Sequence, residues 1–256
     1  MSSRTWTPGA LSAEQRPLSG ICWRVIEAQH RVSTLKLVDT LDEQSLLESL
    51  IEETKPPVPP ECRHLHYLLS TPFRYASIYP RGSRFRRAGM TLGVYYASAS
   101  AATAVAEMTF HRLLFFAESP ATPWPVNAGE FTAFSVPYAT ALGIDLTKPP
   151  LSRDEAIWTN VTAYEGCQAL AEAARAAAIT VIAYRSVRDP GRGTSMALLS
   201  CTAFARDEPT ERETWRIQFG VSGARAVCEF SDARLEFGRA AFAADPRIAR
   251  LNWERG

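Results

Sequence analysis

A long Ala-rich stretch, residues 153–178, runs directly into the most strand-like segment of the chain, Ile179 to Val187. The turn Asp189-Pro190-Gly191 follows, and then a second apolar run from Met196 to Phe204. Isoleucine, valine and tyrosine favour strands, and a Pro-Gly step favours a turn. This part of the chain therefore predicts a long helix, a strand, a turn and a second apolar segment, which indicates a protein of mixed class.

The rest of the chain continues this mixture. Thr40 and Glu43 form a capping box that starts a helix, and this helix must end before the prolines at 56–60. A second helix, residues 101–116, can be capped by Ser98 or Ser100. Further strands are expected at 21–26, 91–98, 130–136, 215–221 and 225–230.

The order of these segments predicts the domain organisation. We find no internal repeat and no linker after residue 20, so we expect a single α+β domain over residues 20–240. Its central mixed or antiparallel sheets should be flanked by helices. Residues 1–19, rich in Ser, Thr, Pro and Gly, are expected to form a loose leader, and residues 241–256 a frayed C-terminal tail.

The composition excludes several classes of protein. With 256 residues, 46% of them hydrophobic, the chain can bury a core rather than stay disordered. Its formal net charge of +1 gives no global field that would attract nucleic acid or an acidic membrane. No window approaches the roughly 20 apolar residues of a membrane span, and the N-terminus lacks the apolar segment of a signal peptide. We therefore expect a cytoplasmic protein.

The charge is balanced overall but not locally. The segment from Cys62 to Ala106 contains no Asp or Glu, whereas the preceding segment from Asp39 to Glu61 holds seven acids. Guanidinium forks match phosphate oxygens, and a Gly82-Ser83-Arg84 turn would add backbone N–H groups, so the first segment is a candidate anion site. The alternative is a solvated loop. The arginines of this segment are Arg63, Arg74, Arg81, Arg84, Arg86 and Arg87.

The first acid after this segment is Glu107, two turns into the Ala-rich helix. Its neighbours are apolar, and a carboxylate in such a place costs desolvation unless another group compensates it. Glu107 could stabilise a developing cation, or it could lie on the polar side of its helix. Tyr96 precedes that helix and offers a flat face on which a ring could stack, although tyrosine in a strand can also be core.

Three blocks of residues occur in order along the chain. The first is Trp23-Arg24-Val25, the second is Gly82-Ser83-Arg84-Phe85 with Tyr96-Ala97-Ser98 and Glu107, and the third is Tyr184-Arg185-Ser186-Val187-Arg188 leading into Gly191-Arg192-Gly193. Together they resemble the RES-domain toxins of bacterial RES–Xre toxin–antitoxin systems. The blocks span about residues 21–205, and their combination is more specific than any one of them.

The resemblance implies an ADP-ribosyltransferase-like fold and an enzyme that uses NAD+ as a substrate, without a metal. Such a toxin would cleave the nicotinamide–ribose bond and transfer ADP-ribose to an acceptor, which we take to be a protein. An NAD+ phosphorylase or glycohydrolase without a protein acceptor is the alternative. A cognate Xre-type antitoxin would cover the active site, with no direct contact to nucleic acid or membrane. A non-enzymatic module that binds a phosphorylated ligand is the alternative of another class.

The resemblance also implies roles for individual residues. Glu107 would stabilise the oxocarbenium-like ribose, as a carboxylate does beside the sugar in glycosidases. Ser186 would hydrogen-bond the ribose or the nicotinamide amide and need not be a nucleophile. Arg24 and Arg84 would hold the phosphates or ribose of NAD+, and Tyr96 would pack against its nicotinamide end. Glu107, Arg84 and Ser186 are thus the expected catalytic residues.

The sequence departs from the family pattern in three places. Gly193-Thr194-Ser195 stands where many relatives carry Asn. Arg86 and Arg87 occur where the family varies in length, so either could do part of the work given to Arg84. Residues 35–60 are longer than in the smaller members, and we interpret them as an extra surface helix in preference to a lid or an acceptor-recognition element.

Metal and disulfide chemistry have little support in the sequence. Cys62, His64 and His66 lie close together, but no second cluster completes a tetrahedral set, so we expect no metal site. The five cysteines are odd in number and widely spaced, which argues against a disulfide framework and a zinc ribbon. His111 follows Glu107 by one helical turn and could touch it, and we favour a structural role.

Overall fold

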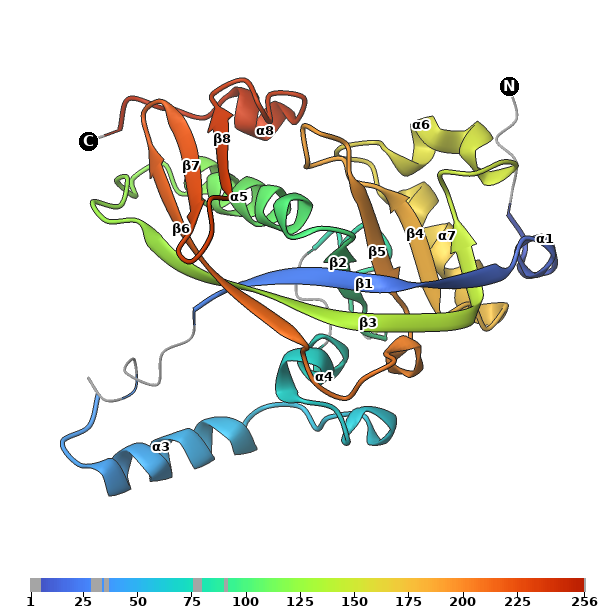
Figure 1. The fold of residues 1–256 in the computed structure, drawn as a ribbon, viewed down its shortest axis with the longest axis horizontal. Helices are drawn as coiled ribbons and strands as arrows, with labels where there is room; N and C mark the ends of the chain where they lie inside the picture. The colour runs from blue at the N-terminus through green and yellow to red at the C-terminus, as the bar shows by residue number, and fades with distance from the viewer. Residues whose placement is uncertain (1–5, 29–33, 35–36, 76–79, 90–91, 256) are drawn as a thin grey trace.

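The computed structural model describes residues 6–28, 34, 37–75, 80–89 and 92–255. Eight strands form one sheet in the order β1-β2-β5-β4-β3-β6-β7-β8, and β1 also pairs with β3 (Figure 1). The pairing of β3 with β4 is parallel and the other pairings are antiparallel. The strands are β1 (Arg16–Glu27), β2 (Tyr95–Ser98), β3 (Gly129–Asp145), β4 (Val181–Arg185), β5 (Thr194–Leu198), β6 (Glu211–Gly220), β7 (Gly223–Cys228) and β8 (Arg234–Gly238).

The strand β3 organises the sheet because it is long enough to pair with three partners. Its 17 residues pair with β1 along one edge and with β6 and β4 at the two ends of the other edge. Successive pairings β1–β2, β2–β5, β5–β4, β4–β3 and β3–β1 then close a ring of five strands. The strands β6, β7 and β8 extend from this ring as an antiparallel meander.

Helices cover the sheet on several sides. The main ones are α1 (Pro8–Ala13), α3 (Leu41–Glu53), α4 (Tyr67–Arg74), α5 (Ala101–Glu118), α6 (Glu155–Trp158), α7 (Glu165–Ala176) and α8 (Pro246–Ala249). Short 3-10 turns are η1 (Pro60–Cys62), η2 (Leu151–Asp154) and η3 (Cys201–Ala203). The sequence prediction of a single α+β domain with a mixed sheet flanked by helices is confirmed.

The core consists of three apolar clusters, one under each covering element. Beneath α5, residues such as Phe110 pack against Trp215 and the meander. Beneath α7, Leu170 packs against Ile182 and Ala197, and beneath α4, Leu69 packs with Met196 and Leu198. Alternate residues of β5 thus enter different clusters because successive side chains of a strand point to opposite faces.

Several expected elements differ in extent from those observed. Within the expected leader, Pro8–Ala13 form α1 with Leu11 fully buried, and β1 begins at Arg16 rather than at residue 21. The long helix expected over 153–178 is broken into η2, α6 and α7, with residues 159–164 between the last two. The strand expected at 91–98 is shorter, and Thr91 lies outside the described residues.

The C-terminal segment packs on the domain instead of fraying. The buried Arg255 donates to the carbonyl oxygens of Phe116, Ser119 and Thr122 at the end of α5, at 2.8, 3.2 and 3.3 Å. The rings of Trp124 and Trp253 stack with centroids 5.8 Å apart. This segment therefore belongs to the folded domain.

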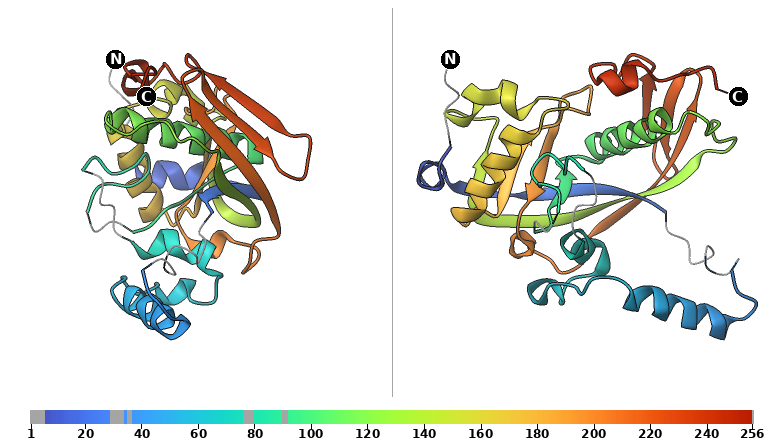
Figure 2. Two further views of the ribbon diagram at one scale, coloured as in Figure 1. Left: turned by 90° about the vertical axis from the view of Figure 1, so that its left-hand side faces the viewer. Right: turned by 180° about the vertical axis from the view of Figure 1, so that it is seen from behind.

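The helix α3 begins as predicted and lies at the surface. Thr40 and Glu43 form both hydrogen bonds of the capping box. None of the residues of α3 is buried, and Leu46 and Leu50 are 61% and 50% exposed. Figure 2 shows α3 at the edge of the molecule, apart from the sheet. The expected extra helix is present, but it covers little of the domain.

Candidate functional site

The centre of the candidate site is a hydrogen bond between Ser186 and Glu107. Ser186 directly follows β4, and Glu107 lies on α5. The Ser186 hydroxyl donates to Glu107 Oε1 at 2.5 Å and accepts from the backbone N–H groups of Arg188 and Asp189, at 3.2 and 2.9 Å. Two of the expected catalytic residues, 79 positions apart in sequence, are therefore in direct contact.

The loop after Ser186 is held to the start of α5 by Asp189. Its carboxylate accepts from Gly191 N, Gly193 N and the Thr103 hydroxyl, at 2.8, 3.1 and 2.9 Å. Thr103 lies in the first turn of α5, whose N-cap is Ser100. A Cβ at position 193 would lie 2.2 Å from Thr103 Oγ1, so any larger residue there would require the loop or Thr103 to shift. The contacts of Asp189 thereby fix Ser186 relative to Glu107.

The surroundings of Glu107 shift its pKa in opposite directions. Burial raises the pKa of the Glu107 carboxyl, while the Ser186 hydrogen bond and the charges of Arg188 and Arg84 lower it. The result is a pKa above the ordinary value. The side chain remains partly accessible to solvent. Such a carboxylate is desolvated and still held by donors and cations, which is typical of functional acids.

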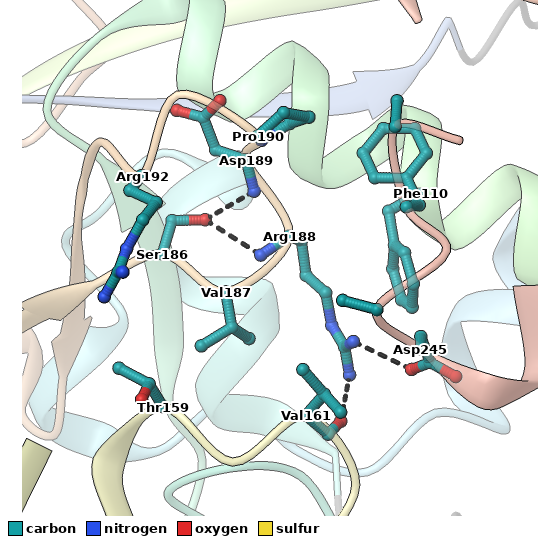
Figure 3. Close-up of a pocket in the computed structure, with 13 residues that line it drawn as sticks. Phe110, Thr159, Val161, Ser186, Val187, Arg188, Asp189, Pro190, Arg192 and Asp245 are labelled. Carbon is teal, nitrogen blue, oxygen red and sulfur yellow. Dashed lines mark hydrogen bonds and ion pairs between the residues drawn. The ribbon is translucent and has the colours of Figure 1, made fainter. Parts of the chain in front are cut away.

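Arg188 was not singled out by the sequence, yet it holds the site together. Its buried guanidinium pairs with Asp245 at 2.8 Å and donates to the Val161 carbonyl at 2.5 Å and the Tyr164 hydroxyl at 2.8 Å. It also lies 4.0 Å from the centroid of the Phe110 ring (Figure 3). The block Tyr184–Arg188 contained this residue, but nothing in the sequence indicated Asp245 as its partner.

A cavity of about 310 Å³ opens beside this arrangement. Figure 3 shows Ser186, Val187 and Asp189 on one side and Phe110 and Asp245 on the other. Its remaining lining residues are Thr159, Val161, Arg188, Pro190, Arg192, Ala241, Phe242 and Ala244. The C-terminal segment therefore contributes one wall of the cavity.

Tyr96 and Arg24 are also in contact with each other. The guanidinium of Arg24 donates to the Tyr96 carbonyl at 3.0 Å, and the Tyr96 hydroxyl bonds Ser83 at 2.8 Å and accepts from Phe85 N at 2.9 Å. Both side chains are partly exposed. Burial raises the pKa of the Tyr184 hydroxyl, and the charges of Glu107 and Tyr96 raise it further.

Three arginines of the expected anion-binding segment, Arg84, Arg86 and Arg87, are engaged with the protein. Arg84 is buried and donates to the Trp158 carbonyl at 2.7 Å, and its guanidinium lies 5.0 Å from the Tyr164 ring centroid. Arg87 pairs with Glu172. Arg86 donates to the Tyr75 carbonyl. Arg84 is thus a buried cation that acts on Glu107 through its charge.

The structure places His111 on α5 and His66 of the Cys62–His66 cluster at the start of α4. His111 is exposed on α5, and its ring centroid lies 5.3 Å from that of Phe110. His66 caps α4 through Nδ1, which accepts from Leu68 N at 3.2 Å. Within the described ranges, no three His, Cys, Asp or Glu residues gather as metal ligands would. Among all the residues that the structure describes, no helix is long and apolar enough to cross a membrane.

Comparison with known proteins gives a family for this site. The model of the RES domain matches residues 58–220, which include Arg84, Tyr96, Glu107 and Ser186. No curated protein matches the chain. A solved structure titled "Crystal structure of the M.tuberculosis MbcT-MbcA toxin-antitoxin complex" is similar at 13% identity and a TM-score of 0.46, over 80% of this chain and 89% of that one. Because the family model covers more than half of the sequence, the chain belongs to the RES domain family.

Proposed function

We propose that this chain is the toxin of a toxin–antitoxin system and that it consumes NAD+, breaking the nicotinamide–ribose bond and passing ADP-ribose to an acceptor protein. The observation that carries the proposal is the 2.5 Å hydrogen bond from Ser186 to Glu107. It occurs in a chain of the RES domain family, beside a cavity of about 310 Å³. A desolvated carboxylate held by donors is suited to stabilising positive charge that develops next to it.

The proposed reaction places that positive charge on the ribose. The bond between ribose C1′ and the nicotinamide nitrogen breaks, neutral nicotinamide leaves with the bonding electrons, and the ribose becomes oxocarbenium-like. The Glu107 carboxylate lowers the free energy of this transition state. A nucleophile of the acceptor then bonds to C1′ and loses its proton. Glu107 must be ionised throughout these steps.

In this scheme Ser186 acts on Glu107 rather than on the substrate. A hydroxyl has one hydrogen to donate and two lone pairs, and Ser186 donates to Glu107 while it accepts from two backbone N–H groups. Its hydrogen-bonding capacity is therefore used within the protein. We assign it to holding Glu107 in its ionised form and in a fixed orientation.

The remaining roles in the proposed reaction belong to Arg24, Arg84 and Tyr96. Arg24 and Tyr96 are partly exposed, and we assign them to the phosphates or ribose and to the nicotinamide end of NAD+. Arg84 is buried, so it supports catalysis mainly by its positive charge near Glu107. The partner in this proposal is an Xre-type antitoxin that covers the site, and the reaction takes place in the cytoplasm, where NAD+ is present.

The variant Glu107→Gln tests the proposal because it keeps the size of the side chain and removes its charge. Removing one such electrostatic stabiliser should lower the rate of NAD+ loss by about 10²–10³-fold. The control is Glu118→Gln on the same helix, whose exposed carboxylate should be dispensable. The measurements are NAD+ consumption by purified protein and transfer of label from adenylate-labelled NAD+ to proteins of a cell lysate. An unchanged rate in Glu107→Gln would overturn the proposal.

The same assay separates the alternative functions. Loss of NAD+ without labelling of any protein would identify an NAD+ phosphorylase or glycohydrolase, and dependence on added phosphate would distinguish these two. Binding of a phosphorylated ligand that survives Glu107→Gln, without loss of NAD+, would identify a non-enzymatic module. Growth arrest by the wild-type chain, its absence in Glu107→Gln and its relief by co-expression of a helix-turn-helix protein from the adjacent gene would support the toxin role.

A further inference from the structure

The sulfur atoms of Cys62 and Cys201 lie 2.7 Å apart, although the two residues are 139 positions apart in sequence. Cys62 ends η1, and Cys201 begins η3. Both are free thiols with only 1% and 3% of their surface exposed. The other cysteines have different neighbours: Cys22 donates to the Val136 carbonyl, and Cys167 contacts Arg84. Nothing in the spacing of the cysteines along the chain indicated this pair.

The backbone on both sides of the pair is held by its own hydrogen bonds. Cys62 N donates to the Pro59 carbonyl at 2.9 Å, and Phe204 N donates to the Cys201 carbonyl at 3.2 Å. His66 N donates to the Asp207 carbonyl at 2.8 Å and joins the two segments directly. The proximity of the two sulfurs is therefore set by the surrounding main chain.

The geometry points to a covalent modification site. A disulfide has an S–S distance of about 2.0 Å, so the two sulfurs need to approach by only about 0.7 Å. We propose that hydrogen peroxide oxidises Cys62 and Cys201 to an intramolecular disulfide that latches η1 to η3. This inference is independent of the proposed NAD+ chemistry.

The reaction consumes one peroxide for each disulfide. One thiolate attacks a peroxide oxygen, the O–O bond breaks, and a sulfenic acid and water form. The second sulfur attacks the sulfenic sulfur, the S–S bond forms, the S–O bond breaks, and a second water leaves. Two thiols and one hydrogen peroxide thus give one disulfide and two waters. The two sulfurs supply the two electrons that reduce the peroxide.

Burial makes this site a slow latch rather than a rapid sensor. Burial, and to a smaller extent the hydrogen bond to Cys201, raises the pKa of the Cys62 thiol well above its usual range. Because the thiolate is the reacting form, oxidation at neutral pH should be slow. The same burial shields a disulfide, once formed, from reducing thiols.

The latch would join two segments that the fold holds only by non-covalent contacts. The turn η1 follows the proline-rich connector from α3. The segment after η3 is bonded to β3, because Ala205 N donates to the Pro137 carbonyl and Thr210 N to the Ser135 carbonyl. A disulfide would therefore tie the connector of α3 covalently to the segment bonded to β3.

The test uses the purified full chain, treated with hydrogen peroxide or with buffer and then alkylated under denaturing conditions. Non-reducing peptide mapping should find the peptides of Cys62 and Cys201 linked, and the count of free thiols should fall from five to three. The oxidised protein should have a higher Tm, because the cross-link limits the unfolded chain. Cys62→Ser and Cys201→Ser should lose the linkage, whereas Cys228→Ser, also buried, should keep it.

Peptide mapping of the wild-type protein tests the proposal even if a variant does not fold. Five alkylated thiols after prolonged peroxide treatment would overturn the proposal. A linkage between any other pair of cysteines, or sulfinic acid on Cys62 without a linkage, would overturn it as well. A linked pair together with a raised Tm that returns to the untreated value after reduction of the unfolded protein would support it.

Discussion

At the scale of single residues, Ser186 favours the ionised form of Glu107. Its hydroxyl donates to the carboxylate, and that hydrogen bond lowers the pKa of Glu107 against the effect of burial. A hydrogen bond to a charged group contributes about 1.5–3 kcal/mol, and one pKa unit corresponds to about 1.4 kcal/mol. The function proposed for Glu107 therefore depends on a neighbour that does not touch the reacting bond.

This dependence gives a prediction for pH. In the proposed mechanism Glu107 acts only when ionised, so the rate should fall as the pH drops through its raised pKa. In Ser186→Ala the pKa of Glu107 should rise further, because the hydrogen bond that lowers it is lost, and the acidic limb of the profile should move to higher pH. The measurement is kcat/KM for NAD+ against pH, with the exposed Ser231→Ala as control. A profile that loses height without moving would contradict the role given to Ser186.

The ion pair between Arg188 and Asp245 allows a second prediction. Removing one partner of a buried pair costs about 3–5 kcal/mol, because the other charge stays buried. Asp245→Leu should have this full effect on the free energy of unfolding. Arg188→Met should cost less, because Asp245 keeps Arg247 at 2.8 Å. Denaturant unfolding of the two variants checks the order, and the reverse order would show that Arg247 does not compensate.

At the scale of elements, the loop from Ser186 to Thr194 is positioned by its close approach to α5. Gly193 has an ordinary backbone conformation, so space rather than backbone angles favours glycine there. Asp189 of the loop accepts from the Thr103 hydroxyl of α5, and Ser186 donates to Glu107 of the same helix. The distance between Ser186 and Glu107 is therefore sensitive to anything that separates these two elements.

Gly193→Ala should disturb the site through this contact. The added Cβ would lie 2.2 Å from Thr103 Oγ1 and 2.8 Å from Asp189 Oδ2, so the loop must shift, at a cost of about 1–3 kcal/mol. NAD+ turnover should fall with stability. Gly220→Ala, where the new Cβ meets nothing within 4 Å, is the control. Adding Thr103→Ala should restore part of the loss, since it removes the nearest atom. No gain in the double variant would mean that the clash is not with Thr103.

At the scale of the whole molecule, the segment that matches the family model lacks part of the sheet. Residues 58–220 lack β1, which pairs with both β2 and β3 and closes the ring of strands. They also lack Asp245 and the cavity wall formed by the C-terminal segment. The outer segments thus complete both the sheet and the site.

The chain restricted to residues 58–220 should therefore not fold to the native state. Its two open strand edges, at β2 and β3, should leave it aggregated or without a cooperative thermal transition. Circular dichroism and size-exclusion chromatography of this fragment, compared with the full chain, provide the check. A monomeric fragment with a cooperative transition at the Tm of the full chain would refute this view of the fold.

The sequence predicted local features of the fold better than features that depend on contacts between distant residues. The caps at Thr40 and Ser100 and the strand before Ser186 were predictable because they depend on neighbouring residues. The prediction of one long helix over 153–178 was wrong, because the alanines concentrate at 169–178 and the chain bends over 159–164, which lets Trp158 and Cys167 enter one buried cluster. Helix propensity is a weak preference that tertiary packing overrides.

The sequence by itself determined the class of the fold, the resemblance to RES domains and the candidates Glu107 and Ser186. Only the tertiary structure decided that these two side chains touch, that Arg188 is held by Asp245, and that Cys62 meets Cys201. The reason is physical. Propensities and caps act between residues a few positions apart, whereas contacts across 57 to 139 positions form only when the sheet closes and the whole core packs at once.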